Sequence, residues 1–401
     1  MSVEGGQTWR STAGSVLKYN VRLLFLCGLW PLGQGRLYAV LTTSVLVAAT
    51  LHAAGAFVGL CSEPGGLQEV TLSLANLFVV CSAIVKSCFF LADRTRFCAL
   101  VTTLDRLVLE SSQRGPVDAA LGSRLAASRR RAVRLTLAFH LYVLSALVAW
   151  SLMPAIHRQR RLPYQQLRWL DTSSAAVYGA SYALQCTATF FCSFINTHLD
   201  VFFMAVMIHV TDQFRILAAR FADLRLDADC NPERRVLQDG SSRLSEELYR
   251  ELSLCIQNHQ DLVRLVHLLD DVMSPIAMTQ FVVGAVNACM VLFPATYSTD
   301  VGAVLKCWAA LPMVGIQIFL YCSGAHDIME QAETVSSAAY DCSWLGADRR
   351  RRRALLLVMC RAQRPLQLTA GKLYPINRPT FLSLLQVTYS YYTLLQNLNS
   401  R

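Results

Sequence analysis

The sequence predicts an all-α membrane protein built around seven transmembrane helices. Of its 401 residues, 54% are apolar and only 16% are charged, whereas a soluble chain carries about 25% charged residues. The apolar residues gather in runs of about 20, the length that crosses a bilayer, and lysine and arginine cluster between these runs. Because backbone groups in hydrocarbon must be hydrogen-bonded within their own segment, each run is expected to be a helix.

Seven runs meet this description, although they differ in character. The first carries no charge, and the second is interrupted only by Lys86 near its end. The fourth is far longer than a bilayer is thick, so it is expected to continue beyond the membrane as a soluble helix. It contains Asp200, the one candidate for an intramembrane acid, at a depth where the chain is expected to leave the lipid. The predicted spans are residues 37–61, 70–92, 132–153, 173–210, 272–297, 301–323 and 376–398.

The positive residues predict the orientation, because Lys and Arg gather on the cytosolic side of a membrane. Of the 37 Lys and Arg residues, 29 fall on the side that holds the N-terminus, five on the other side and three within spans, with Arg134 at the start of the third span counted on the N-terminal side. The N-terminus is therefore predicted to be cytosolic, and seven spans make the C-terminus extracellular. G-protein-coupled receptors have the opposite orientation. Their Asp-Arg-Tyr signature is absent, since Asp105-Arg106-Leu107 follows the second span and not the third.

This topology divides the chain into six parts. They are a cytosolic N-terminal segment (1–36), transmembrane helices one to four (37–210), a cytosolic helical segment (211–271), helices five and six (272–323), a second cytosolic helical segment (324–375) and the seventh helix (376–398). Each cytosolic helical segment is expected to contain an amphipathic helix, the first beginning at Ser245 and the second covering 348–364. These helices either form a packed bundle that joins subunits, which their apolar faces favour, or lie on anionic lipids of the inner leaflet.

The motifs that would indicate catalysis are absent. The sequence has no His-Glu-x-x-His pair, no glycine-rich phosphate loop and no Gly-x-Ser-x-Gly elbow. His259 and His267 are eight residues apart, too far for the i, i+4 spacing of paired metal ligands. The basic run 349–353 fits a topological anchor better than a nucleic-acid contact. We therefore expect no enzyme activity, cofactor, metal or nucleic-acid partner.

The C-terminal segment carries a group of short motifs. They are Pro365-Leu366-x-Leu368, Ala370-Gly371-Lys372, Thr380-Phe381, Tyr389-Ser390-Tyr391 and Leu394-Leu395. This group resembles the signature of insect odorant receptors, and the length and predicted topology are similar to that family as well. The Thr-Tyr-(five residues)-Gln-Phe signature of the sister gustatory receptors fits less well, because Gln396 comes one position late and Asn397 replaces Phe. The chain is shorter than the family's co-receptor, so it resembles an odour-tuned subunit.

The resemblance implies a ligand-gated, non-selective cation channel that opens when small volatile molecules bind. It implies three kinds of partner: odorant co-receptor subunits in a heterotetramer, the volatile ligand, and membrane lipid. The implied location is the plasma membrane of olfactory sensory neuron dendrites, which the chain crosses several times. The alternative is a gustatory-type receptor or a membrane transporter, although transporters usually need more intramembrane acids than this sequence has.

The seventh helix of that family lines a central pore, and the composition of span seven is compatible with this role. Polar residues alternate with leucines there, as a pore with an apolar constriction requires. By family position, the constriction falls at Leu394. The other reading is that the polar side chains hydrogen-bond between packed helices. The implied pore and gate residues are Tyr391, Leu394, Asn397 and Leu398.

The family's ligand pocket lies in the outer half of the bundle, among helices two, three, four and six. An apolar volatile ligand suits an aromatic wall with few polar groups. Tyr178 and Tyr182 are four residues apart and are expected to share a helix face. Aromatic side chains also anchor helices at membrane interfaces, so each candidate has that alternative role. The candidates are Phe78, Tyr142, Ser145, Trp150, Tyr178, Tyr182 and Trp308.

Overall fold

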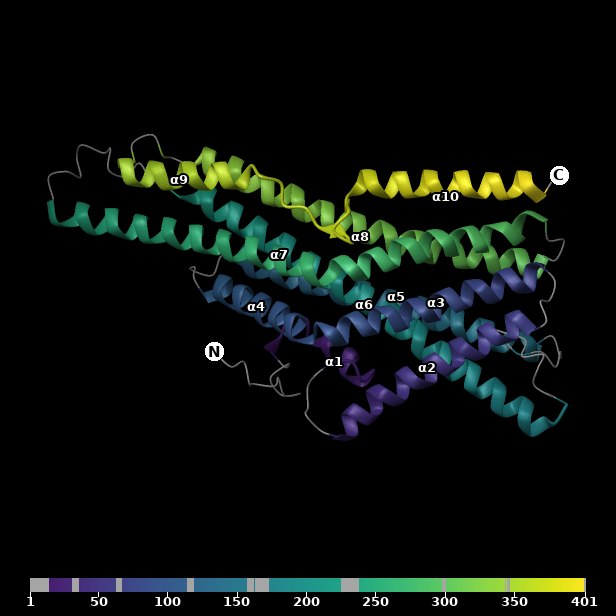
Figure 1. Ribbon diagram of the computed structural model, residues 1–401. Coiled ribbons are helices and arrows are strands. Elements are labelled where there is room, and N and C mark those ends of the chain that lie inside the picture. Colours follow the sequence, from purple (N-terminus) through teal and green to yellow (C-terminus); the bar gives the residue numbers. More distant parts are fainter. Residues whose placement is uncertain are drawn as a thin grey trace.

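The computed structural model describes residues 14–30, 36–62, 67–113, 119–156, 162, 173–224, 238–297, 301–342, 344 and 347–399. The helices are α1 (Lys18–Leu26), α2 (Arg36–Ser62), α3 (Leu67–Ala92), α4 (Arg94–Gln113), α5 (Ala119–Ile156), α6 (Ala175–Asp223), α7 (Gln238–Tyr297), α8 (Val301–Asp341), α9 (Arg349–Ala362) and α10 (Arg378–Asn399). A short antiparallel hairpin, β1 (Thr369–Ala370) and β2 (Tyr374–Pro375), precedes α10. The helices run roughly along one axis and form an elongated bundle (Figure 1).

The structure confirms the predicted all-α, seven-helix membrane fold. A helix covers each predicted span, or all of it but the first two residues in the case of α6 and α10; these helices are α2, α3, α5, α6, α7, α8 and α10. Within the described residues, the five helices α2, α3, α5, α6 and α7 are long and apolar enough to cross a membrane. As its length predicted, the fourth span continues as one helix beyond residue 210: α6 ends at Asp223.

Of the two predicted amphipathic helices, the first differs from the prediction in its boundaries and the second agrees with it. The amphipathic helix expected to begin at Ser245 begins at Gln238 and continues without a break into the fifth span, so the two form the single helix α7. The second one, α9, agrees with the prediction, and the Asp348 carboxylate caps it by accepting from the Arg350 backbone N–H. Helices α1 and α4 and the hairpin were not predicted, since none carries a long apolar run.

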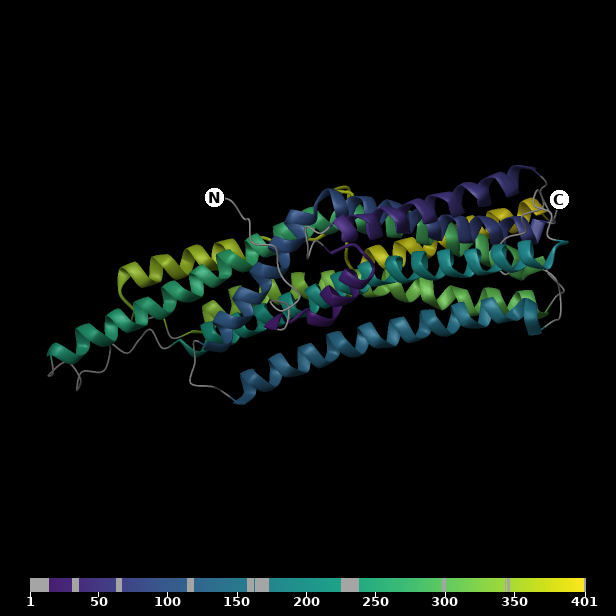
Figure 2. The ribbon, with the colours of Figure 1, turned by 90° about the horizontal axis from the view of Figure 1, so that it is seen from below.

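The core is organised around α6, which packs against α1, α2, α3, α4, α5, α7 and α8. Five buried aromatic rings meet where α1, α3, α4 and α6 converge: Trp30, Phe90, Phe97, Phe202 and Phe203. By contrast, α5 runs along one edge of the bundle (blue in Figure 2) and exposes most of its surface. In α7, Leu252, Leu262 and Leu269 are buried in the main core, so the apolar face of this helix is covered within the chain itself.

Candidate functional site

Two of the predicted ligand residues form an aromatic corner between α5 and α6. The rings of Tyr178 and Tyr182 have centroids 5.8 Å apart, so they share a face of α6 as their spacing predicted. The Tyr182 hydroxyl donates to the backbone carbonyl of Ser151 on α5. One turn further along α6, Cys186 Sγ lies 3.6 Å from Ser151 Oγ. These contacts fix the start of α6 against the last turns of α5.

The other predicted ligand residues are more dispersed. Trp150 is half-buried on α5 and directly precedes Ser151 in the chain. Tyr142 and Ser145 are exposed on α5, and the Ser145 hydroxyl donates to the Tyr142 carbonyl over 2.8 Å within the same helix. Phe78 is half-buried on α3. The side chain of Trp308 lies outside the described residues.

A buried polar network joins four helices further along the bundle. Lys86 Nζ on α3 lies 2.6 Å from Asp200 Oδ1 on α6 and 2.6 Å from Gln280 Oε1 on α7. The Tyr321 hydroxyl on α8 donates to the same Asp200 oxygen over 2.8 Å, and Gln280 donates to Gln317 over 2.9 Å. At 1.5 Å per residue, Asp200 lies about 33 Å along α6 from Tyr178. The network and the aromatic corner therefore lie far apart along the bundle.

The sequence singled out Asp200 as the one candidate for an intramembrane acid, and the structure shows that it is buried inside the protein. Asp200 is 2% exposed and Lys86 is 0% exposed, and they form a salt bridge in the protein interior. A charge buried in a low dielectric needs such a partner, because the loss of its hydration is otherwise uncompensated. The signal in the sequence was one cation and one anion in two otherwise uncharged spans, and their pairing was missed.

The predicted pore helix α10 lies on the outside of the isolated chain. It runs alongside α7 and α8 (Figure 1) and packs against those two helices. Tyr391 is 58% exposed and Leu394 is 54% exposed; Asn397 is also exposed, and the side chain of Leu398 lies outside the described residues. The hydroxyls of Thr388, Ser390 and Thr393 each donate to a carbonyl of α10 itself. These hydroxyls are thus satisfied without a neighbouring helix.

The Ala370-Gly371-Lys372 motif forms a clamp between α7 and the start of α10. Gly371 and Lys372 both have positive φ, 60° and 57°, as a type I′ hairpin turn requires. The Gly371 backbone N–H donates to the Ser274 carbonyl over 2.9 Å, and the Lys372 backbone N–H donates to Ser274 Oγ over 2.8 Å. A lysine in this left-handed conformation is strained, and these two hydrogen bonds to α7 hold it there.

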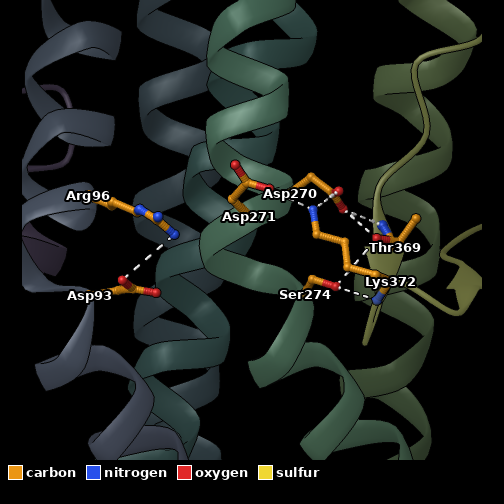
Figure 3. A network of polar contacts seen from close by, with 7 residues as sticks. All are labelled: Asp93, Arg96, Asp270, Asp271, Ser274, Thr369 and Lys372. Atoms are coloured by element: carbon orange, nitrogen blue, oxygen red, sulfur yellow. Dashed lines mark hydrogen bonds and ion pairs between the residues drawn. The ribbon is translucent and has the colours of Figure 1, made fainter.

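The side chain of Lys372 completes the clamp, as Figure 3 shows. Its ammonium lies 2.5 Å from Asp270 Oδ2 and 2.7 Å from Asp271 Oδ1, while Thr369 donates to Asp270 from both its backbone N–H and its hydroxyl. Burial lowers the pKa of Lys372, but hydrogen bonds and charge from Asp270 and Asp271 outweigh it and raise the pKa above its ordinary value. A second ion pair, Arg378 to Asp327 over 2.8 Å, joins the first residue of α10 to α8.

Comparison with known proteins finds odorant receptors both among family models and among individual sequences. The family model "7tm Odorant receptor" matches residues 66–389. Odorant receptor Or2 of Anopheles gambiae is 29% identical over 37% of this chain, Odorant receptor 67a of Drosophila melanogaster 24% over 59%, and Odorant receptor 10 of Aedes albopictus 23% over 85%. The aligned parts amount to 39%, 56% and 87% of those proteins' lengths.

The solved structures extend the likeness to the whole fold. The olfactory receptor OR5 from Machilis hrabei superposes with a TM-score of 0.80, covering 94% of this chain and 97% of that one, at 17% identity. Its structure in complex with eugenol superposes equally well. At this identity the superposition shows the fold alone, whereas the family model covers most of the sequence. The chain belongs to the seven-transmembrane odorant receptor family.

Proposed function

We propose that this chain is an odour-tuned receptor subunit of a ligand-gated, non-selective cation channel. The observation that carries the proposal is the position of α10. It lies on the outside of the chain with Tyr391 and Leu394 exposed, yet it is tied at its base to α7 and α8 by Lys372 and Arg378. A helix so placed meets its copies at the axis of an oligomer, where Leu394 forms the apolar constriction and Asn397 lies one turn further out.

The channel is proposed to be a tetramer with odorant co-receptor subunits. In support, α9 also exposes apolar side chains, with Leu356 50% and Leu357 68% exposed. Exposed apolar side chains of this kind mark protein contacts. The same proposal gives the chain a cytosolic N-terminus, an extracellular C-terminus and the domain limits predicted above. It places the chain in the plasma membrane of sensory dendrites.

The ligand is proposed to be a small volatile molecule bound in the outer half of the bundle, near the aromatic corner. A related receptor, OR5 from Machilis hrabei, has been solved in complex with eugenol. Eugenol is itself a small aromatic molecule of the class that Tyr178, Tyr182 and Trp150 suit. Because Tyr182 uses its hydroxyl to bind the α5 backbone, its ring face is the part available to a ligand.

The test is to express the chain with its co-receptor and record whole-cell current during an odour panel, with G-protein signalling blocked by GDPβS. The proposal predicts odour-evoked cation current that the block does not reduce. Tyr182→Ala should change the order of effective odours, whereas Tyr182→Phe, which keeps the ring, should preserve more of it. Odour responses that require G-protein signalling would contradict the channel, and an unchanged odour profile in Tyr182→Ala would exclude the α6 site.

A further inference from the structure

A groove of about 860 Å³ opens between α5, α6 and α8, far from the aromatic corner. Its charged lining consists of Arg130, Arg131, Arg134, Asp212, Arg215 and Asp327, and we call it the arginine groove. Four arginines against two aspartates leave it an excess of two positive charges. The groove lies at the end of the membrane that the charge distribution assigns to the cytosol.

Both aspartates of the arginine groove already have basic partners. Asp212 accepts from Arg215 over 3.1 Å and also accepts from Ser128. Asp327 accepts from Arg378 over 2.8 Å. Among the residues that the structure describes, Arg130, Arg131 and Arg134 form no ion pair, and all three are exposed. The positive charge of these three side chains is therefore free to bind an anion.

The groove changes from charged to apolar in the same direction on all three helices. On α5, Arg130, Arg131 and Arg134 are followed towards the membrane centre by Leu135 and Ala138. On α6, Asp212 and Arg215 give way to Ile208 and Met204; on α8, Asp327 gives way to Leu320. A soluble phosphate would use only the charged end. An amphiphile with an anionic head and an acyl chain matches both ends.

We propose that the arginine groove binds an anionic phospholipid of the adjacent leaflet, with its phosphorylated headgroup on Arg130, Arg131 and Arg134 and an acyl chain along Leu135 and Ala138. Guanidinium groups bind phosphate through paired, charge-assisted hydrogen bonds, and basic pockets between transmembrane helices bind such headgroups. Asp327 lies between this groove and Arg378 of α10. The groove that holds the lipid is therefore linked to the start of the proposed pore helix through the Asp327–Arg378 ion pair. The binding site rests on the proposed orientation but not on channel activity.

The test uses the purified full-length receptor, with its co-receptor if the complex is the stable form, and follows its melting temperature. The probes are dioctanoyl phosphatidylinositol 4,5-bisphosphate, dioctanoyl phosphatidylcholine and free inositol hexakisphosphate. The anionic lipid should raise the melting temperature, and the other two should not. In the variant Arg130→Gln/Arg131→Gln/Arg134→Gln, lipid affinity should fall roughly 100-fold, since each basic side chain near an anionic headgroup contributes roughly fivefold.

The matched control is Arg349→Gln/Arg352→Gln/Arg353→Gln, which removes three exposed positive charges from α9. It should bind the anionic lipid like the wild type. If the α5 triple variant does not fold, the single variant Arg134→Gln should still weaken binding about fivefold relative to Arg353→Gln. An equal loss of lipid affinity in the α5 and α9 variants would overturn the assigned site. If inositol hexakisphosphate raised the melting temperature as much as the anionic lipid does, the ligand would be a soluble phosphate and the lipid proposal would be wrong.

Discussion

The guanidinium of Arg378, the first residue of α10, lies 2.8 Å from the carboxylate of Asp327 on α8. The clamp of Lys372 on Asp270 and Asp271 lies only six residues earlier in the chain. The base of the proposed pore helix is thus fixed to two different helices within one short stretch. A movement of α7 or α8 would act on the start of α10 directly through these contacts.

The first prediction concerns the Arg378–Asp327 ion pair. Asp327→Asn and Arg378→Gln should each shift the odour concentration for half-maximal current by up to about fivefold, since partly exposed pairs contribute about 1 kcal/mol or less. The double variant should shift it no further than the larger single shift, because both changes remove the same contact. Arg96→Gln, which breaks an exposed pair with Asp93 on another part of the bundle, is the control and should leave the dose–response curve unchanged. Additive shifts in the double variant would show that the two residues act separately.

The second prediction concerns the left-handed turn at Gly371. A Cβ added there would meet Met278 Cγ at 3.1 Å, and its φ of 60° disfavours any side chain. Gly371→Ala should therefore destabilise the receptor by about 1–2 kcal/mol, visible as a lower melting temperature and reduced surface delivery. Gly315→Ala is the matched control, because no atom lies within 4 Å of its added Cβ. A melting temperature equal to that of the control would contradict the clamp geometry.

The third prediction concerns the buried pair of Lys86 and Asp200. Lys86→Met leaves an unpaired carboxylate in the core and should cost about 3–5 kcal/mol, as should Asp200→Leu. The double variant Lys86→Met/Asp200→Leu removes both charges and should recover much of that loss. Thermal melting of the purified protein measures all three. A double variant less stable than either single one would show that the residues are not a pair.

The seven helices were predictable because each membrane span is a run of about 20 mostly apolar residues, which can be seen in its own sequence. The contact between Tyr178 and Tyr182 was predictable for the same reason, since i, i+4 spacing on one helix fixes it. The second amphipathic helix, α9, also followed from local sequence.

What the sequence did not predict depends on distant parts of the chain. Lys86 and Asp200 are 114 residues apart, and nothing local marks them as partners. The Ala370-Gly371-Lys372 motif was visible, but its role requires Ser274 and Asp270 on α7, about a hundred residues earlier. The start of α7 was placed too late because Ser245 resembles a helix cap, whereas the helix already runs from Gln238.

The fourth prediction concerns pH and His259, on the part of α7 that precedes its predicted span. Burial, with a smaller contribution from the charge of Arg361, lowers the pKa of His259 to about 4. In the unfolded chain, His259 binds a proton near pH 6.5. Its contribution to the free energy of unfolding is therefore fully present above that pH and is lost as the pH drops towards 4. The loss should total about 3 kcal/mol.

Melting temperatures between pH 7 and pH 4.5 measure this effect. His259→Gln should remove most of the decline, whereas His267→Gln, which changes an exposed histidine of the same helix, should keep it. An identical pH profile in His259→Gln and the wild type would show that other groups cause the decline.

The most direct test of the central claim, that α10 lines a cation pore, is chemical modification of Leu394→Cys. The variant is expressed with the co-receptor, and a charged, membrane-impermeant thiol reagent is applied from outside during the odour response. If α10 lines the pore, Leu394→Cys should show a rapid, irreversible change in cation current. Thr388→Cys, at a half-buried position where the backbone carbonyl lies 3.9 Å from Cys289 Sγ on α7, should show little change. A Leu394→Cys current that the reagent leaves untouched would contradict the pore assignment.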